Sequence, residues 1–260
     1  SPLPSVDEFI HSIPQPTPFP AILVIGPEEH AEHFPPLHRW LPDFLSDPRK
    51  ACLWDIGGML PAKLALGEPS SQHGFPTMVP IETTSGPLWI LPPWGKTDSL
   101  VLEQEADRIR FLKQMNSTIG TLSELWVALP ARSLKKFRRF LPAIDLACVI
   151  LPFHPDALLR GYETVKTLHL LGFSRPISVL VEQPSEKHSS QEVFTRLAST
   201  AKRFLSLDLH LGGVVQSGQQ SGAELSKPPL REVIEALPSG QKAFLLHFAD
   251  EHLYPRPESD

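Results

Sequence analysis

The residues best placed to do chemistry begin with Gly26, directly after an apolar run at positions 21–25. In nucleotide-binding α/β proteins, a glycine between a strand and a helix marks the usual position of the phosphate loop. Such a loop needs free backbone N–H groups, a lysine and a hydroxyl that reaches magnesium. Positions 26–33 hold one glycine, three glutamates and no lysine, serine or threonine. We therefore expect no cofactor at this loop, which begins Gly26, Pro27, Glu28, Glu29, His30.

Histidines in the same segment suggest metal binding as a second chemistry. His30 and His33 are three residues apart, so they would share one face of a helix, and His38 follows. Two histidines at this spacing recur by chance, and a solvated acidic first turn, which also suits the helix macrodipole, is the favoured explanation of the segment. We therefore expect no metal. The alternative is an active enzyme with an unconventional nucleotide or metal site near the end of the first strand, using His30, His33 and Asp55.

Composition and charge exclude several classes of partner. The chain has 260 residues, of which 41% are hydrophobic and 20% charged, as in ordinary globular proteins. A net charge of −5 argues against an electrostatic grip on nucleic acid or anionic lipid. No apolar run approaches the roughly 18 residues of a membrane span. We expect a cytoplasmic protein in which Cys52 and Cys148 are buried, reduced thiols.

Short apolar runs alternate with helical patterns along the chain. This alternation predicts a parallel sheet covered on both faces, a three-layer αβα, doubly wound, mostly parallel sheet of about seven strands. Ligands of such sheets bind at the carboxyl ends of the strands. The expected strands are residues 21–25, 51–55, 88–91, 125–129, 146–151, 177–181 and 209–215. The expected helices are residues 29–45, 100–118, 133–140, 155–171, 191–205 and 230–252, and residues 68–87 are expected to be loop.

The chain shows no internal repeat and no convincing linker. We expect a proline-rich N-terminal arm at residues 1–20, a single α/β domain at 21–252 and a tail at 253–260. The tail carries two prolines and net negative charge, which argues against a membrane-anchoring helix.

With these elements placed, the chain resembles the MinD/ParA family of deviant-Walker, P-loop NTPase-like ATPases. Within that family it is most similar to the flagellar-placement branch, the FlhG/FleN type. The match is carried by residues 53–67, 88–92 and 150–168, and by two later pieces at 194–205 and 211–215. The third stretch is similar to the family's block P-x-A-L-x-x-A-Y-x-x-I-K-x-L. In order and spacing the resemblance covers roughly residues 20–250.

Departures from the family pattern fall on the residues that carry its chemistry. At the positions that match the family's loop Lys-Gly-Gly-x-Gly-Lys-Thr/Ser, this chain has no lysine. Of the acidic pair after the second strand only Asp55 remains, and we expect it to cap or orient the following Gly-Gly turn. Ala128 stands where the family has its magnesium-holding aspartate, and Glu182 or Gln183 stands for its adenine-contacting asparagine. The resemblance therefore implies a degenerate member: a pseudo-ATPase, not an enzyme, acting as an adaptor, scaffold or regulatory subunit of a bacterial cellular machine.

Two features suggest contacts with a protein partner. A basic run could be an ordinary solvated face or a surface for an acidic partner. Trp94, between a proline and a glycine, is a candidate exposed anchor. We expect protein partners, including a homodimer or a heteromer with a related ATPase, and neither nucleic acid nor direct membrane anchoring. The basic residues are Lys135, Lys136, Arg138 and Arg139.

Overall fold

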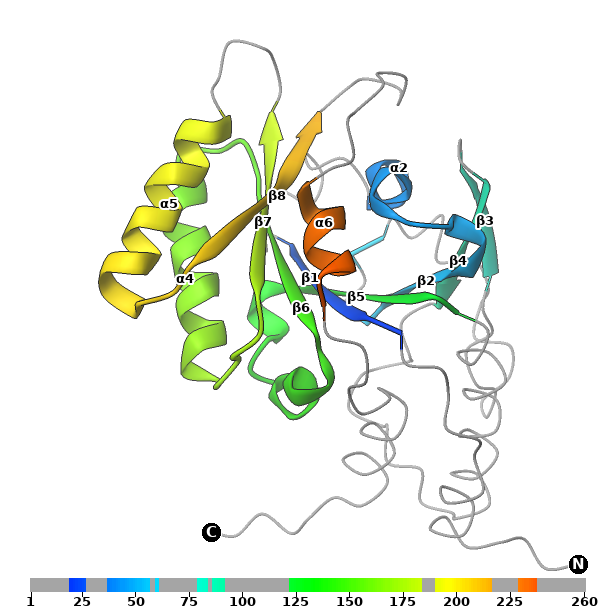
Figure 1. The fold of residues 1–260 in the computed structure, drawn as a ribbon, viewed down its shortest axis with the longest axis horizontal. Coiled ribbons are helices and arrows are strands. Elements are labelled where there is room, and N and C mark those ends of the chain that lie inside the picture. Colours follow the sequence, from blue (N-terminus) through cyan, green and yellow to red (C-terminus); the bar gives the residue numbers. More distant parts are fainter. Residues whose placement is uncertain are drawn as a thin grey trace, which may run out of the picture.

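The protein is built on one eight-stranded sheet (Figure 1). The computed structural model describes residues 19–26, 37–56, 59–60, 79–83, 86–91, 122–183, 190–216 and 229–237. The strand order is β3-β4-β2-β5-β1-β6-β7-β8. All neighbouring pairs are parallel except β3 and β4. The strands are β1 (Ala21–Gly26), β2 (Ala51–Asp55), β3 (Val79–Thr83), β4 (Gly86–Leu91), β5 (Glu124–Pro130), β6 (Leu146–Leu151), β7 (Ile177–Gln183) and β8 (Leu209–Gln216).

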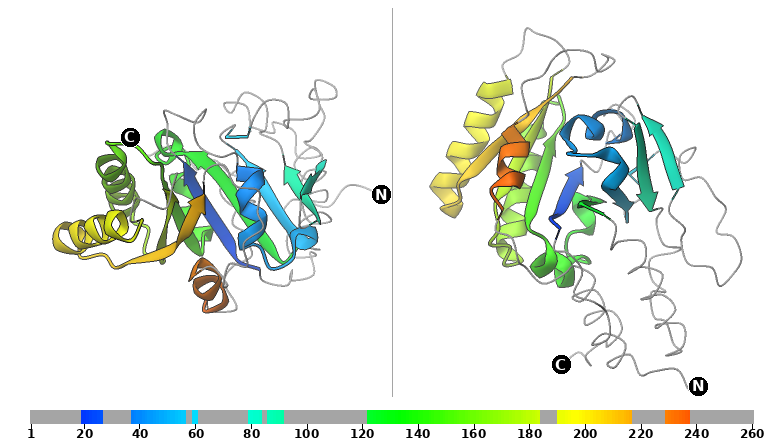
Figure 2. Two further views of the ribbon diagram at one scale, coloured as in Figure 1. Left: turned by 90° about the horizontal axis from the view of Figure 1, so that it is seen from above. Right: turned by 45° about the vertical axis from the view of Figure 1, so that its right-hand side comes forward.

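Helices cover both faces of the sheet. Successive side chains of a strand point to opposite faces, and the apolar side chains on both faces are buried by helices. Leu23 and Ile25 of β1 belong to one hydrophobic cluster, with residues of α4 and α5. Ile22 and Val24 belong to a second cluster, with residues of α2, η1 and α6. The two sets of helices lie on opposite sides of the strands (Figures 1 and 2). The α-helices are α2 (Leu37–Trp40), α4 (Ala157–Leu170), α5 (Ser190–Leu205) and α6 (Pro229–Glu235), and the 3₁₀ helices are η1 (Leu41–Phe44), η2 (Pro48–Lys50), η3 (Ala131–Ser133) and η4 (Arg138–Ala143).

The three-layer, mostly parallel architecture is confirmed, with one strand more than the sequence predicted. The missed strand is β3, in a stretch expected to be loop, and it pairs antiparallel with β4. Only Ile81 of its five residues is buried. Pro80 cannot donate to a ladder, which is tolerated in a strand at the sheet edge. Weak apolar signal and a proline therefore concealed an edge strand.

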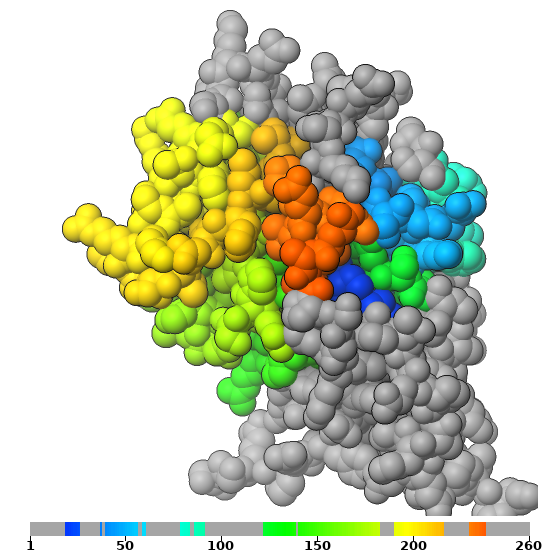
Figure 3. All heavy atoms as spheres, viewed as in Figure 1, coloured from blue at the N-terminus to red at the C-terminus, as the bar shows by residue number. Residues whose placement is uncertain are grey.

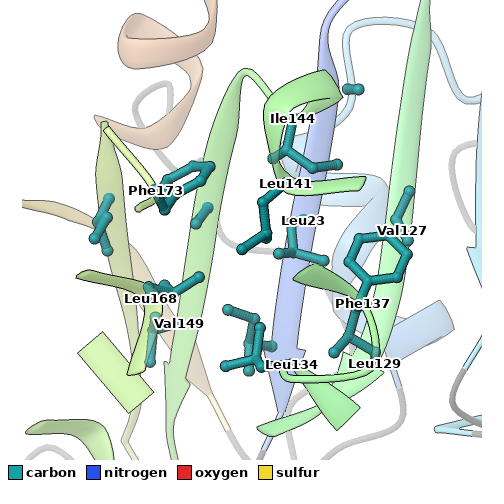
Figure 4. Packing of buried hydrophobic residues seen from close by; sticks show 14 of the residues in the cluster. Leu23, Val127, Leu129, Leu134, Phe137, Leu141, Ile144, Val149, Leu168 and Phe173 are labelled. Carbon is teal, nitrogen blue, oxygen red and sulfur yellow. The ribbon is translucent and has the colours of Figure 1, made fainter. Parts of the chain in front are cut away.

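The conformation of the basic segment also differs from the sequence prediction, which places an α-helix at residues 133–140. It forms turns and the 3₁₀ helix η4. Its buried residues Leu134, Phe137 and Phe140 are spaced by three, the repeat of a 3₁₀ helix. Figure 4 shows Leu134 and Phe137 beside Leu23 and other residues of the first hydrophobic cluster.

Two further helices differ in extent from their predictions. In the described part of the predicted helix at 29–45, α2 passes directly into η1, which has Pro42 within its first two residues. Proline removes a backbone donor, so an α-helix does not continue through it. At the other end of the chain, α6 ends at Glu235. Residues 238–252 of the predicted last helix, and the whole helix predicted at 100–118, lie outside the described residues.

A buried carboxylate ties α6 to the sheet. Glu124, at the start of β5, is 2% exposed and accepts a hydrogen bond from Trp126 Nε1 at 3.0 Å. It also accepts from the backbone N–H of Ser46 at 3.1 Å and forms a salt bridge with Arg231 of α6. In the space-filling view α6 lies at the surface between β8 and the segment of α2 and η1 (Figure 3). The ion pair therefore fixes α6 over the centre of the sheet.

The strand order places a topological switch point at β1. Its two neighbours, β5 and β6, are parallel to it and come much later in the chain. The chain leaves β1 for β2 on one side, whereas β6, β7 and β8 lie on the other. Carboxyl ends of strands at such a point form the usual ligand-binding crevice of α/β sheets. Among the described residues, no helix has the length and apolar character needed to cross a membrane.

Candidate functional site

The carboxyl end of β1 is covered by a methionine side chain. Gly26 is the last residue of β1. A Cβ atom added at Gly26 would lie only 2.0 Å from Met59 Cε and 3.3 Å from Met59 Sδ. Met59 packs against the second hydrophobic cluster, and the adjacent Leu60 is part of it. An apolar side chain therefore occupies the space directly over the glycine at which a phosphate loop would begin.

Asp55 holds this methionine in position. It is the last residue of β2 and is 1% exposed. Its two carboxylate oxygens accept hydrogen bonds from Met59 N at 2.7 Å and from Leu60 N at 2.9 Å. A carboxylate that bonds backbone N–H groups a few residues ahead closes a turn. The structure thus places Asp55 as the residue that orients the segment after β2.

The neighbouring strand offers no acid at the same level of the sheet. Asp55 of β2 pairs with Ala128 of β5, and Ala128 in turn pairs with Val24 of β1. Ala128 is fully buried within the second hydrophobic cluster. Among the described residues of β1, β2 and β5, Asp55 therefore supplies the only carboxylate at this level of the sheet.

Glu182, near the end of β7, is engaged with the loop after β6. It is 8% exposed, and its Oε2 accepts a hydrogen bond from the backbone N–H of Phe153 at 2.8 Å. This bond joins the carboxyl ends of β6 and β7. Glu182 therefore links β7 to the loop after β6, and the side chain of Gln183 lies outside what the structure describes.

The basic segment after β5 borders a cavity at the same edge. The cavity has a volume of about 310 Å³ and lies where β1, β5 and β6 end, against α4. Lys135 lines it, whereas Lys136 and Arg138 are exposed but do not. The sequence did not single out two other cations of the cavity, Arg132 and Arg160. The described residues that line it are Ile25, Gly26, Ala131, Arg132, Leu134, Lys135, Ile150, Pro152, Arg160, Gly161, Glu163, Thr164 and Thr167.

Several candidate residues from the sequence are outside the described residues. Pro27, Glu28, Glu29, His30 and Trp94 fall in undescribed ranges, as does His33, and the side chains of His38 and Arg139 are not described. Within the described ranges, no group of three or more His, Cys, Asp or Glu residues could hold a metal ion.

Both cysteines are buried free thiols. Burial raises the pKa of the Cys52 thiol to about 12, and it raises the pKa of Cys148 as well. Cys52 belongs to the first hydrophobic cluster and Cys148 to the second, so they face opposite sides of the sheet. They are placed as core residues and not as nucleophiles.

Comparison with known proteins defines the class of fold. No family model matches the chain, and no curated protein matches it. ParA of pNOB8, solved bound to nonspecific DNA, matches at a TM-score of 0.52 and 9% identity, over 91% of this chain and 99% of that one. A second structure of pNOB8 ParA has a TM-score of 0.51 and 10% identity, over 91% of this chain and 99% of that one. The MinD cell division protein of Aquifex aeolicus has a TM-score of 0.42 and 12% identity, over 89% of this chain and 95% of that one.

The two structures with TM-scores above 0.5 are both ParA. The chain shares their P-loop NTPase α/β fold, as the resemblance in the sequence predicted. At identities of 9% and 10% this likeness shows the fold alone, so the function must be argued from the site.

Proposed function

We propose that this chain is a non-catalytic relative of the MinD/ParA ATPases, a pseudo-ATPase that serves as a protein-binding adaptor, scaffold or regulatory subunit of a bacterial cellular machine. The observation that carries the proposal is the contact of Met59 with Gly26. Bound phosphates need close approach to backbone N–H groups after the first strand. The thioether side chain fills that approach and offers neither charge nor a hydrogen-bond donor.

Other residues at this edge support the same proposal. Phosphoryl transfer depends on positive groups and magnesium to neutralise the developing charge of the phosphates. Residues 26–33 supply no lysine, and Ala128 supplies no carboxylate for the metal. The carboxylate of Asp55 is engaged by two backbone N–H groups. Residues 26–33 and Ala128 therefore lack the lysine and the carboxylate that would hold a magnesium nucleotide at the end of β1.

The adaptor role rests on the basic segment after β5. Lys135, Lys136 and Arg138 are exposed there, while Phe137 and Phe140 stack with ring centroids 4.8 Å apart and anchor the backbone. A fixed segment with outward cations suits an acidic protein surface. We place the protein nearest the FlhG/FleN branch, in the cytoplasm, with a protein partner that includes a second copy or a related ATPase. Neither nucleic acid nor a direct membrane anchor is part of this proposal.

The experiment that tests the proposal is thermal melting with magnesium and ATP or ADP. A nucleotide at a hundredfold excess over its Kd would stabilise the folded state by about 2.7 kcal/mol. We expect no shift in Tm, with a nucleotide-binding ParA protein measured in parallel as the positive control. A saturable shift that Asp55→Ala abolishes would overturn the proposal. That result would support the alternative, an active enzyme with an unconventional nucleotide or metal site near the end of β1.

A further inference from the structure

We propose that the outward side of α4 is a contact surface between two copies of this chain, in which the α4 helices of the two copies lie antiparallel to each other. This inference rests on the part of the proposed function that includes a second copy among the partners, and it assigns the surface at which the copies meet. α4 packs against β6 and α5 (Figures 1 and 2). Its residues Gly161, Val165 and Leu168 are buried there, so the opposite side of the helix faces away from the core.

Large apolar side chains stand at both ends of this outward side. Leu159 is 61% exposed, and Leu170 is 73% exposed, the highest value for a large apolar side chain among the described residues. The outward side of a surface helix normally carries polar residues. Here it forms one line with steps of four, three and four residues, which is the spacing along the seam of a coiled coil. The residues of this line are Leu159, Glu163, Lys166 and Leu170.

The order of these four residues makes the line complementary to itself. A twofold axis at the midpoint of the line, with the two helices antiparallel, places Leu159 opposite Leu170 of the second copy. The same axis places Glu163 opposite Lys166 of the second copy, and both contacts occur twice because a twofold interface is reciprocal. Parallel helices in register would instead place each charge opposite its own kind. The sequence of the outward line therefore fits a second, antiparallel copy of α4.

The two charged residues of the line are available for this contact. Glu163 and Lys166 are exposed, and neither forms an ion pair within the part of the chain that the structure describes. Exposed ion pairs add little affinity, but opposite charges across an interface set the orientation of the partners. The leucines would supply the apolar area that drives association, and the charges would select the antiparallel direction.

The size of the contact predicts a weak dimer. α4 has 14 residues, which corresponds to about 21 Å of helix. A single pair of helices of this length buries less surface than the roughly 1,200–2,000 Å² of a standard interface. We therefore expect a reversible dimer with a Kd on the order of 100 µM.

Charge reversal tests the contact by sedimentation velocity, with nucleotide-free protein at about 10–500 µM. Glu163→Lys and Lys166→Glu each turn both attractive contacts into repulsive ones. Each variant alone should therefore dimerise at least about tenfold more weakly than the unaltered protein. An equimolar mixture of the two variants should associate again, because every charge is then opposite to its counterpart across the axis. Unfolding of either variant cannot imitate this restoration.

A matched control separates the contact from a general effect of charge. Lys50→Glu, at an exposed position in η2, changes the net charge as Lys166→Glu does and should alter dimerisation less than about twofold. The inference is overturned by a protein that stays monomeric at the highest concentration, which would leave α4 to a different partner. A dimer that neither charge reversal weakens, or a mixture that associates no better than its components, also overturns it.

Disulfide trapping tests the direction of the helices. Leu159→Cys and Leu170→Cys are mixed under mild oxidation, one of them with an affinity tag, and the native cysteines are buried. The mixed pair should crosslink much faster than either variant alone, since equal positions of two antiparallel helices lie about 16 Å apart along the axis, too far for a disulfide. Equal or faster crosslinking of either variant with itself would contradict the antiparallel pairing.

These outcomes are distinguishable from those of the nucleotide experiment. A protein that nucleotide stabilises, and whose dimer still depends on Glu163 and Lys166, would retain the α4 contact and lose the pseudo-ATPase proposal. A protein that shows neither a nucleotide shift nor a dimer would retain the pseudo-ATPase proposal and lose the α4 contact. The Tm of each variant, compared with that of the unaltered protein, checks that the fold is intact.

Discussion

Asp55→Ala is the substitution that most directly tests how the end of β1 is covered. The buried carboxylate accepts backbone hydrogen bonds from Met59 at 2.7 Å and Leu60 at 2.9 Å. Alanine removes both acceptors, and the turn that holds Met59 over Gly26 loses its closure. We expect the segment from Ile56 to Leu60 to open locally and the whole protein to lose stability.

The size of the loss follows from the two bonds. A hydrogen bond to a charged group contributes about 1.5–3 kcal/mol, so two bonds give a gross loss of about 3–6 kcal/mol. Alanine also removes a carboxylate that is 1% exposed, which returns part of its desolvation cost. The released N–H groups can meet water once the turn opens. We therefore expect the free energy of unfolding to fall by about 2–4 kcal/mol.

Urea denaturation measures the global loss, and amide hydrogen exchange at Met59 and Leu60 measures the local one. Both amides should exchange much faster in the variant, while amides within β6 should change only with global stability. Asp47→Ala is the control, because Asp47 also caps a backbone N–H, that of Arg49, but at an exposed site. A loss below about 1 kcal/mol, or unchanged protection of the two amides, would refute the reasoning that Asp55 fixes the methionine.

Three further predictions concern buried and half-buried groups outside this turn. Arg231→Met should cost about 2–4 kcal/mol in urea denaturation, because it leaves the 2% exposed Glu124 carboxylate without its counter-ion. Cys52 and Cys148 should not react with a disulfide reagent in the native protein and should react fully in denaturant, since burial raises both pKa values. Burial also raises the pKa of Asp145, so the folded state holds its proton more tightly than the unfolded state. Stability relative to Asp145→Asn should therefore fall as the pH rises from below the ordinary value of 3.8 through the raised pKa.

Controls for these predictions use the same chain. Arg196→Met breaks an ion pair with Glu192 that is 67% and 62% exposed, so it should cost far less than Arg231→Met. Similar costs for the two arginines would contradict a buried role for Glu124. Rapid native labelling of either cysteine would contradict its placement in the core. A stability difference between wild type and Asp145→Asn that is constant with pH would show that Asp145 titrates alike in both states.

Sequence alone determined the central strands and the two long helices after β6. Strand bounds at β2 and β6 were predicted to the residue, and α4 and α5 within two residues at each end. These elements are local in origin: continuous apolar runs form buried parallel strands, and helical periodicity forms the covering layer. The predictions were wrong where local signals are weak and the conformation depends on contacts with other elements of the chain. These places are the edge strand β3 and residues 134–143, which form turns and the 3₁₀ helix η4.

Tertiary structure alone decided what surrounds the end of β1. Composition showed that residues 26–33 lack the groups of a phosphate loop, but it gave no reason to bring Met59 over Gly26. That contact needs Asp55 at the end of β2 and the pairing of β2 and β1 with β5. Likewise, Arg132 and Lys135 line the same cavity as Arg160 because β5 and β6 flank β1. A side chain's neighbours across a sheet are set by strand order, which no local pattern of residues encodes.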